Sequence, residues 1–165
     1  MSLAAILKQT DIFFELTPTQ LELVASLCQE RRCKAGDVIF EENAASDELY
    51  LIVQGEVDIQ VDPSLVGEEN AQAAPGAVTI ATLRRGQSFG EVALVDQGLR
   101  SATARCAANN TTMLIIARDK LISLCDTYPQ LGYRLMRNLA ADLALKIRST
   151  DLRIREELLY GNRRR

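Results

Sequence analysis

An acidic, a basic and a hydroxyl side chain stand close together in the stretch FGEVALVDQGLRSAT, residues 89–103. The carboxylate of Glu91 lies nine residues before the guanidinium of Arg100, and Ser101 follows directly. An arginine presents a planar fork of N–H donors that matches a phosphate, and a serine hydroxyl adds a further donor. A carboxylate repels a phosphate but accepts hydrogen bonds from sugar hydroxyls. The segment therefore has the chemistry to hold a phosphorylated sugar, as in a nucleotide.

The backbone of this stretch suits an anion as well. Gly90 lacks a Cβ, so the chain can approach a ligand closely. The residues EVALV that follow predict about one turn of helix, whose first N–H groups are free and carry a partial positive charge. Two simpler interpretations stay open: an ion pair between Glu91 and Arg100 without a ligand, and a Ser101 hydroxyl that faces solvent at the start of a strand.

The composition excludes several other functions. The chain has no histidine, which removes a Ser-His-Asp or Cys-His nucleophile and the commonest metal ligand. The cysteines form no CxxC pair, and their apolar neighbours predict buried free thiols rather than a metal or redox site. A net charge of −3 without a basic stripe argues against nucleic-acid binding. The four cysteines are Cys28, Cys33, Cys106 and Cys125.

The length and the ends of the chain indicate one cytoplasmic domain. Its 165 residues suffice for a single core with an appended helical segment. No run reaches the roughly 18 apolar residues of a membrane-spanning helix, and the first residues lack the pattern of a secretory signal. Free thiols fit the reducing cytoplasm. The last three residues, 163–165, are all arginine and predict a solvated tail.

The elements that must position the candidate site change type twice along the chain. Residues 1–33 predict an N-terminal helical segment. Within it, Thr17, Pro18 and Gln20 have the spacing of a capping box with proline at the first helical position. From 34 to 118 the apolar pattern alternates, and glycines at positions 36, 55 and 86 punctuate short antiparallel strands.

Within this β region, residues 78–83 predict a strand, and Asn109-Asn110 predict the turn of a hairpin. Residues 62–77 are polar and rich in proline and glycine, which predicts a long mobile loop.

Residues 119–165 predict C-terminal helices, with Asp119 as the cap of the first and Pro129 at the start of a second that runs to about Leu159. An apolar stripe on the last helix has nearly heptad spacing. We expect its first half to pack on the β domain, and the part beyond about Ile147 to pair with a second copy of the chain. The stripe comprises Met136, Ala140, Leu143, Ile147, Thr150, Ile154 and Leu158.

Two stretches carry a resemblance to a known family. FGEVALVDQGLRSATA resembles the phosphate-binding cassette of the cyclic nucleotide-binding domain family, whose pattern is roughly F-G-E-[LIV]-A-L, five residues, then R-[AST]-A-T. AGDVIFEENAASDELYLIVQGEV, residues 35–57, resembles that family's run of a glycine turn, an alternating strand, an Asp, a Tyr and a Gly-x-Val. The resemblance spans about Ile6 to Tyr128.

The resemblance implies a fold that is mainly β with flanking helices: an eight-stranded antiparallel jelly-roll barrel with N-terminal helices and a C-terminal helical hinge or lid. It implies cyclic AMP or cyclic GMP as the ligand, with no cofactor and no metal. Glu91 would bind the ribose 2′-hydroxyl and Arg100 the cyclic phosphate, with Ser101 and nearby backbone amides completing the cradle. The implied ligand-binding set is Phe89, Gly90, Glu91, Val92, Ala93, Arg100, Ser101 and Ala102.

The residues that would contact the nucleotide base, and the residue of the C-terminal lid that would cover it, are indicated less sharply than the phosphate-binding residues. The family often has proline before the cassette arginine, and Leu99 stands there instead. We expect the loop to be less rigid and the affinity lower for that reason. Ser101 leaves the choice between cyclic AMP and cyclic GMP open. Candidates to line the base are Val78, Ile80, Leu143 and Ile147, with Tyr160 as a further lid candidate.

The expected function is a non-catalytic receptor in which ligand binding draws the C-terminal helix toward the barrel. The expected partners are a cyclic nucleotide and, through the last helix, a second copy of the chain; no effector protein is indicated. A ligand-free structural or dimerisation module of the same fold is the alternative. A cupin-like enzyme is a third possibility, but cupin chemistry usually requires a histidine-rich metal site, and this chain has no histidine.

Overall fold

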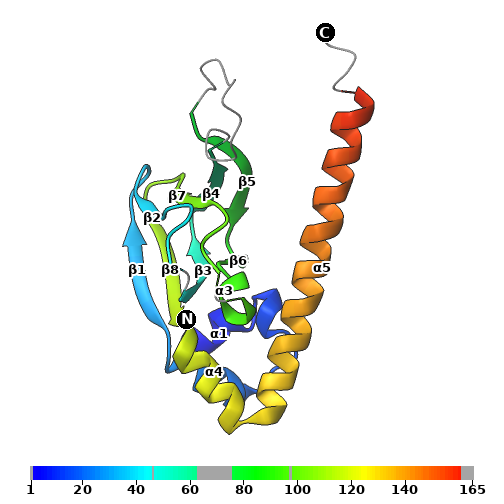
Figure 1. The fold of residues 1–165 in the computed structure, drawn as a ribbon. Helices are drawn as coiled ribbons and strands as arrows, with labels where there is room; N and C mark the ends of the chain where they lie inside the picture. The colour runs from blue at the N-terminus through cyan, green and yellow to red at the C-terminus, as the bar shows by residue number, and fades with distance from the viewer. Residues whose placement is uncertain (1, 46, 63–75, 97, 161–165) are drawn as a thin grey trace.

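The computed structural model describes residues 2–45, 47–62, 76–96 and 98–160. Eight strands form two four-stranded antiparallel sheets, with helices before and after them in the chain (Figure 1). The strands are β1 (Gln29–Cys33), β2 (Val38–Phe40), β3 (Glu48–Gln54), β4 (Glu56–Val61), β5 (Val78–Arg84), β6 (Ser88–Phe89), β7 (Thr103–Cys106) and β8 (Thr111–Ala117). The helices are α1 (Leu3–Leu7), the 3₁₀ helix η1 (Asp11–Phe13), α2 (Pro18–Ala25), α3 (Val92–Val95), α4 (Arg118–Thr127) and α5 (Pro129–Tyr160).

The strand orders are β1-β8-β3-β6 in one sheet and β2-β7-β4-β5 in the other. One apolar cluster contains side chains from both sheets, so part of the core lies between them. The prediction of eight antiparallel strands with flanking helices is confirmed. The strands form two four-stranded sheets, as in a jelly roll, and the described strands do not close into a single barrel.

The N-terminal segment contains the three short helices α1, η1 and α2, within the range where the sequence predicted helices. The capping box at α2 is present: the Gln20 N–H donates to the Thr17 hydroxyl at 3.3 Å, and the Thr17 N–H donates to Gln20 Oε1 at 2.9 Å. The helical prediction fails at its end, however, because residues from Gln29 onward form β1. All five residues of β1 pair with β8, and this tertiary pairing overrides the local pattern.

The predicted hairpin around Asn109-Asn110 is wrong in its pairing. β7 pairs with β2 and β4, whereas β8 pairs with β1 and β3. The two asparagines therefore carry the chain from one sheet to the other. Asn110 does adopt the left-handed conformation, with φ of 60°. Of the predicted loop at 62–77, residues 63–75 lie outside the described part of the chain, as do the arginines at 163–165.

α4 begins two residues earlier than the predicted cap at Asp119 implies. Its N-cap is Ala117, which makes no side-chain capping hydrogen bond, and Asp119 lies in the first turn. A carboxylate there still interacts favourably with the positive end of the helix dipole.

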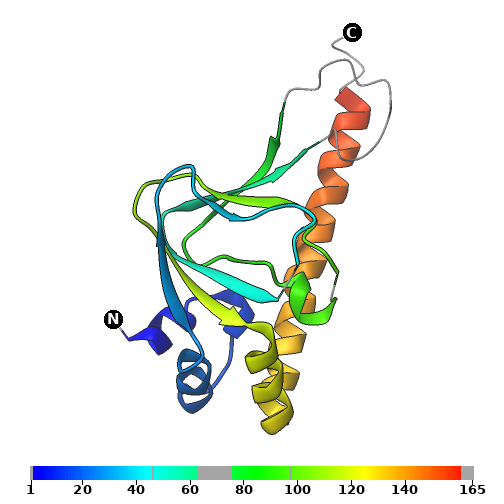
Figure 2. The ribbon, with the colours of Figure 1, turned by 60° about the vertical axis from the view of Figure 1, so that its left-hand side comes forward.

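α5 has 32 residues and is about 48 Å long at 1.5 Å per residue. Its first part packs on the N-terminal helices and α4. Leu131, Leu135 and Leu139 are fully buried in a second apolar cluster, the N-terminal apolar cluster, which they share with side chains of α1, η1 and α2. Beyond that part it runs beside the sheets, as both ribbon views show (Figures 1 and 2). The large apolar side chains from Leu145 onward are exposed. None of the described helices combines the length and hydropathy that a bilayer span requires.

Candidate functional site

A cavity of about 700 Å³ lies between the stretch 89–102, strand β5 and the middle of α5. Small-ligand pockets in proteins typically have volumes of about 300–1,000 Å³. Every member of the predicted cassette set that the structure describes lines this cavity. The members are Phe89, Gly90, Glu91, Val92, Arg100, Ser101 and Ala102; the side chain of Ala93 lies outside the described part.

The backbone of Arg100 is tied to the loop between β2 and β3. Its N–H donates to the Ala44 carbonyl at 2.9 Å, and its carbonyl accepts from the Asn43 N–H at 2.8 Å. The side chain is only 5% exposed. Its Nη2 donates to the Glu48 carbonyl at 2.9 Å and its Nη1 to the Gly90 carbonyl at 3.4 Å. The guanidinium is therefore held by backbone carbonyls of the fold.

The charge of Arg100 is buried without an ion pair among the described residues. Burial lowers the pKa of its guanidinium, and the nearby Tyr50, Asp47, Glu48 and Glu91 oppose that shift. An arginine side chain stays protonated in proteins, so the site keeps one full positive charge. The ion pair with Glu91, which the sequence left open, is absent.

Gly90 is required at its position for two reasons. Its φ is +75°, which lies in the left-handed region. A Cβ placed there would lie 2.6 Å from Arg100 Nη1 and 3.0 Å from the Glu48 carbonyl oxygen. Only glycine lets the guanidinium approach this part of the backbone so closely.

Glu91 is 6% exposed and contacts α5 rather than Arg100. Its Oε1 accepts a hydrogen bond from Lys146 Nζ at 2.7 Å, and the same ammonium lies 2.8 Å from Asp142 Oδ2. Burial by itself lowers the pKa of Lys146, but Glu91 and Asp142 outweigh burial and raise that pKa overall. Lys146 therefore remains charged at neutral pH and joins the last helix to the cassette.

Sequence reasoning missed the face of α5 that lines the cavity. The α5 side chains that line the cavity recur three or four positions apart, which places them on one side of the helix. Arg153 Nη1, which lies on this face, donates to the Ile80 carbonyl of β5. The polar residues at this spacing were the signal that could have revealed this face, although apolar periodicity is easier to recognise. The lining residues are Asp142, Leu145, Lys146, Ser149, Thr150 and Arg153.

The structure separates the base-lining candidates. Ile80 lines the cavity, whereas Val78 does not. Leu143 packs against the N-terminal apolar cluster, and Ile147 is 63% exposed outside the cavity. Tyr160 is exposed and does not line it either. Of the predicted apolar stripe on α5, Thr150 is the residue that lines the cavity in the described part of the chain.

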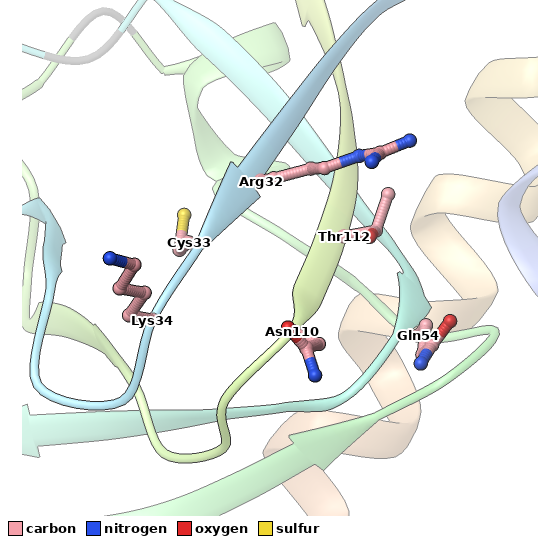
Figure 3. Close-up of a pocket in the computed structure, with 6 residues that line it drawn as sticks. All are labelled: Arg32, Cys33, Lys34, Gln54, Asn110 and Thr112. Atoms are coloured by element: carbon pink, nitrogen blue, oxygen red, sulfur yellow. The ribbon is translucent and has the colours of Figure 1, made fainter.

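A second hollow of about 400 Å³ has no lining residue in common with the first (Figure 3). Arg32, which lines this hollow, has an 80% exposed side chain and forms an ion pair with Glu30, with Nε 2.8 Å from Oε1. Such an exposed ion pair contributes little to stability. Across the described residues, no cluster of three or more metal-ligating side chains is found. The second hollow is lined by Arg32, Cys33, Lys34, Gln54, Asn110 and Thr112.

Comparison with known proteins gives a consistent result. The family model of the cyclic nucleotide-binding domain matches residues 30–128. The cyclic AMP receptor protein of Thermus thermophilus is 32% identical over 148 residues, which cover 90% of this chain and 62% of that protein. A cGMP-dependent protein kinase of Drosophila melanogaster, isozyme 2, is 27% identical over 129 residues, covering 78% of this chain and 13% of the kinase.

A solved structure agrees with the sequence comparison. The crystal structure of the Thermus thermophilus catabolite activator protein superimposes with a TM-score of 0.71 at 31% identity, covering 91% of this chain and 63% of that one. The chain thus spans less than two thirds of the length of these relatives.

Proposed function

Because this chain belongs to the cyclic nucleotide-binding domain family, we propose that it is a receptor for cyclic AMP or cyclic GMP and is not itself an enzyme. One observation carries the proposal. A buried arginine and a buried carboxylate, Arg100 and Glu91, line the same cavity but do not neutralise each other. An anion and a hydroxyl-bearing group on one ligand would satisfy both.

The role of each residue in ligand binding follows from the hydrogen-bond donors and acceptors that the fold leaves unused in the cavity. The cyclic phosphate binds the free N–H groups of Arg100, with the Ser101 hydroxyl as an additional donor. A ribose hydroxyl donates to Glu91, whose carboxylate can accept several hydrogen bonds and so need not release Lys146. The base then lies between residues 80–83 of β5 and the polar side of α5. No cofactor or metal is needed for these contacts.

The identity of the base stays open between adenine and guanine. One relative is named as a cyclic AMP receptor and another as a cGMP-dependent kinase, and the Ser101 hydroxyl suits either ligand. We therefore propose both cyclic nucleotides as candidate ligands and test them side by side.

We propose that binding is coupled to the position of α5. Six side chains of this helix line the cavity, so a ligand gains contacts only while the helix lies against the cassette. Such a ligand has a higher affinity for the closed arrangement and shifts the population toward it. The Lys146–Glu91 pair links the sugar-binding carboxylate to the helix that moves.

Hydrogen–deuterium exchange tests the coupling. With a saturating cyclic nucleotide, we expect slower exchange in the α5 region 142–153, and unchanged exchange in α2, which does not line the cavity. Equal exchange in α5 with and without bound ligand would contradict the coupling while leaving binding intact.

Thermal unfolding tests the receptor function itself. A ligand that binds the folded state raises the melting temperature as its concentration rises above Kd. We expect this rise with cyclic AMP or cyclic GMP and not with 5′-AMP. A melting temperature that none of them changes would favour the ligand-free module of the same fold.

We also propose a homodimer formed by the second half of α5. The support is the row of exposed apolar side chains, Ile147, Ile154 and Leu158 among them, at nearly heptad spacing. Light scattering with Ile154→Glu as the disrupting variant tests it, and a monomeric mass for the unmodified chain would contradict it.

The free thiols of the described cysteines support a reducing compartment such as the cytoplasm. The acidic net charge supports a receptor without a nucleic-acid partner of its own.

A further inference from the structure

Arg100 is an unusual buried charge, because no carboxylate forms an ion pair with it in the described part of the chain. Isolated buried charges are costly unless something compensates for the lost water. Two backbone carbonyls accept from Nη1 and Nη2, while Nε is buried with no hydrogen-bond partner. Of the five N–H donors of a guanidinium, three remain free, so these two bonds alone do not account for the burial.

Aromatic rings supply the missing compensation. The guanidinium carbon lies 4.2 Å from the ring centroid of Phe40 and 5.6 Å from that of Tyr50. Both distances fall within the roughly 6 Å range of cation–π attraction. Phe40 comes from β2 and lines the same cavity as Arg100. The positive charge therefore lies against the electron-rich ring faces on one side and the cavity on the other.

The rings are themselves fixed in place. Tyr50 stacks on Phe89 with centroids 5.0 Å apart and an interplanar angle of 11°, and Phe40 lies 5.5 Å from Tyr50. The Tyr50 hydroxyl donates to Glu48 Oε2 at 2.5 Å. A hydrogen bond to a carboxylate polarises the phenol toward the ring, which strengthens its attraction for a cation.

We infer that Phe40, assisted by Tyr50, is the positioning residue for Arg100: its ring face holds the guanidinium by cation–π attraction, so that the free N–H donors stay available to the cyclic phosphate. This inference rests on the proposed function. A carboxylate partner would occupy two of these donors and neutralise the charge, whereas a ring face does neither. The ring thus holds the cation without competing with the phosphate.

A fluorination series tests the inference. We replace Phe40 by phenylalanines with one, two and three ring fluorines, which withdraw electron density from the ring face while changing its size little. Calorimetry with cyclic AMP and with cyclic GMP should show Kd rising stepwise, by about tenfold for the trifluoro ring, equal to about 1.4 kcal/mol. That is within the range for a desolvated cation–π contact. Phe40→Leu should weaken binding by a similar factor, and Phe40→Trp should restore it.

The matched control is the same series at Phe13, which is buried in the N-terminal apolar cluster and does not line the cavity. Its Kd should stay within twofold of the unmodified chain. A Kd that does not depend on fluorination at Phe40, with binding intact, would overturn the inference alone.

A second measurement decides the matter without a nucleotide. The ring above Arg100 should shift its side-chain Nε–H proton upfield in the NMR spectrum, and Phe40→Leu should abolish most of that shift. If the unmodified chain binds neither cyclic nucleotide, the proposed function fails, and an Nε–H shift that is the same in Phe40→Leu overturns the ring contact as well. A shift that depends on the ring supports the contact.

Discussion

The two buried charges of the cassette are held by different parts of the molecule. Arg100 is held by the sheets, through the carbonyls of Glu48 and Gly90 and the ring of Phe40. Glu91 is held by α5, through Lys146. The proposed phosphate side is therefore organised by the two sheets, whereas the proposed sugar side depends on where the last helix lies. We expect affinity to come mainly from the first region and the response from the second.

The largest effect should come from removing the cation on the phosphate side. Arg100→Ala leaves the phosphate without its charged partner and should cost roughly 2–5 kcal/mol of binding free energy, or about thirtyfold to several thousandfold in Kd. Calorimetry with the cyclic nucleotides measures it. Arg32→Ala, in the other hollow, is the matched control and should bind normally. Unchanged affinity in Arg100→Ala would remove the cassette assignment.

The next largest effect should come from the backbone beneath that cation. Gly90→Ala forces a left-handed φ on alanine, at a cost of about 1–3 kcal/mol, and its Cβ would displace Arg100 Nη1. Both the free energy of unfolding and the nucleotide affinity should fall, as urea titration and calorimetry would show. Gly76→Ala should change neither, because nothing lies within 4 Å of its added Cβ. Normal affinity in Gly90→Ala would mean that Arg100 does not depend on this close approach.

On the sugar side, Glu91→Gln should weaken binding less than Arg100→Ala. The amide oxygen still accepts a hydrogen bond, but hydrogen bonds to a charged group are stronger than neutral ones by about 1 kcal/mol, or about fivefold in Kd. Because Lys146 loses its charged partner on the cassette and keeps only Asp142 on its own helix, exchange in the α5 region 142–153 should become faster in the free protein. A loss of affinity equal to that of Arg100→Ala would contradict the division between the two regions.

The Lys146–Glu91 pair should also be lost at alkaline pH. The pKa of Lys146 is raised in the folded protein, so its stabilising contribution is fully present below the ordinary lysine pKa of about 10.4 and disappears as the pH rises through the folded value. The difference in unfolding free energy between the unmodified chain and Lys146→Met should therefore shrink as the pH rises from 9 toward 12. A difference that grows with pH would contradict this sign.

The smallest effect concerns the loop before Arg100. Leu99 is 64% exposed, and its N–H donates to none of the described acceptors, so proline costs no packing and no hydrogen bond there. Leu99→Pro should raise the free energy of unfolding by about 0.4–1 kcal/mol. It should also improve affinity, because a stiffer loop is better pre-organised for the ligand. A loss of affinity would show that the native backbone at this position does not suit proline.

The cassette could be predicted from sequence because its chemistry is local. Glu91, Arg100 and Ser101 lie within eleven residues, and their types alone indicate a phosphate and a sugar. The partners of these groups could not be predicted in the same way. Phe40 and Lys146 are 60 and 46 residues away from Arg100 along the chain, and only the folded arrangement brings them into the site.

The errors in the fold have a similar origin. The turn residues Asn109-Asn110 predicted a left-handed backbone correctly, but a turn does not determine which strands pair across the sheets. On α5, apolar spacing identified the helix but not its buried face: Leu131, Leu135 and Leu139 are buried, whereas Ala140 of the predicted stripe is exposed. The polar face toward the cavity carries no hydrophobic periodicity to reveal it.

Calorimetric titration of the chain with cyclic AMP and cyclic GMP in parallel, with 5′-AMP as the control, tests the central claim most directly. The 5′ phosphate and the adenine are present in the control, but the cyclic diester is not. We predict saturable binding of at least one cyclic nucleotide and no binding of 5′-AMP. Absence of heat with both cyclic nucleotides at millimolar concentration, or equal binding of 5′-AMP, would contradict the assignment of this cavity as a cyclic nucleotide receptor site.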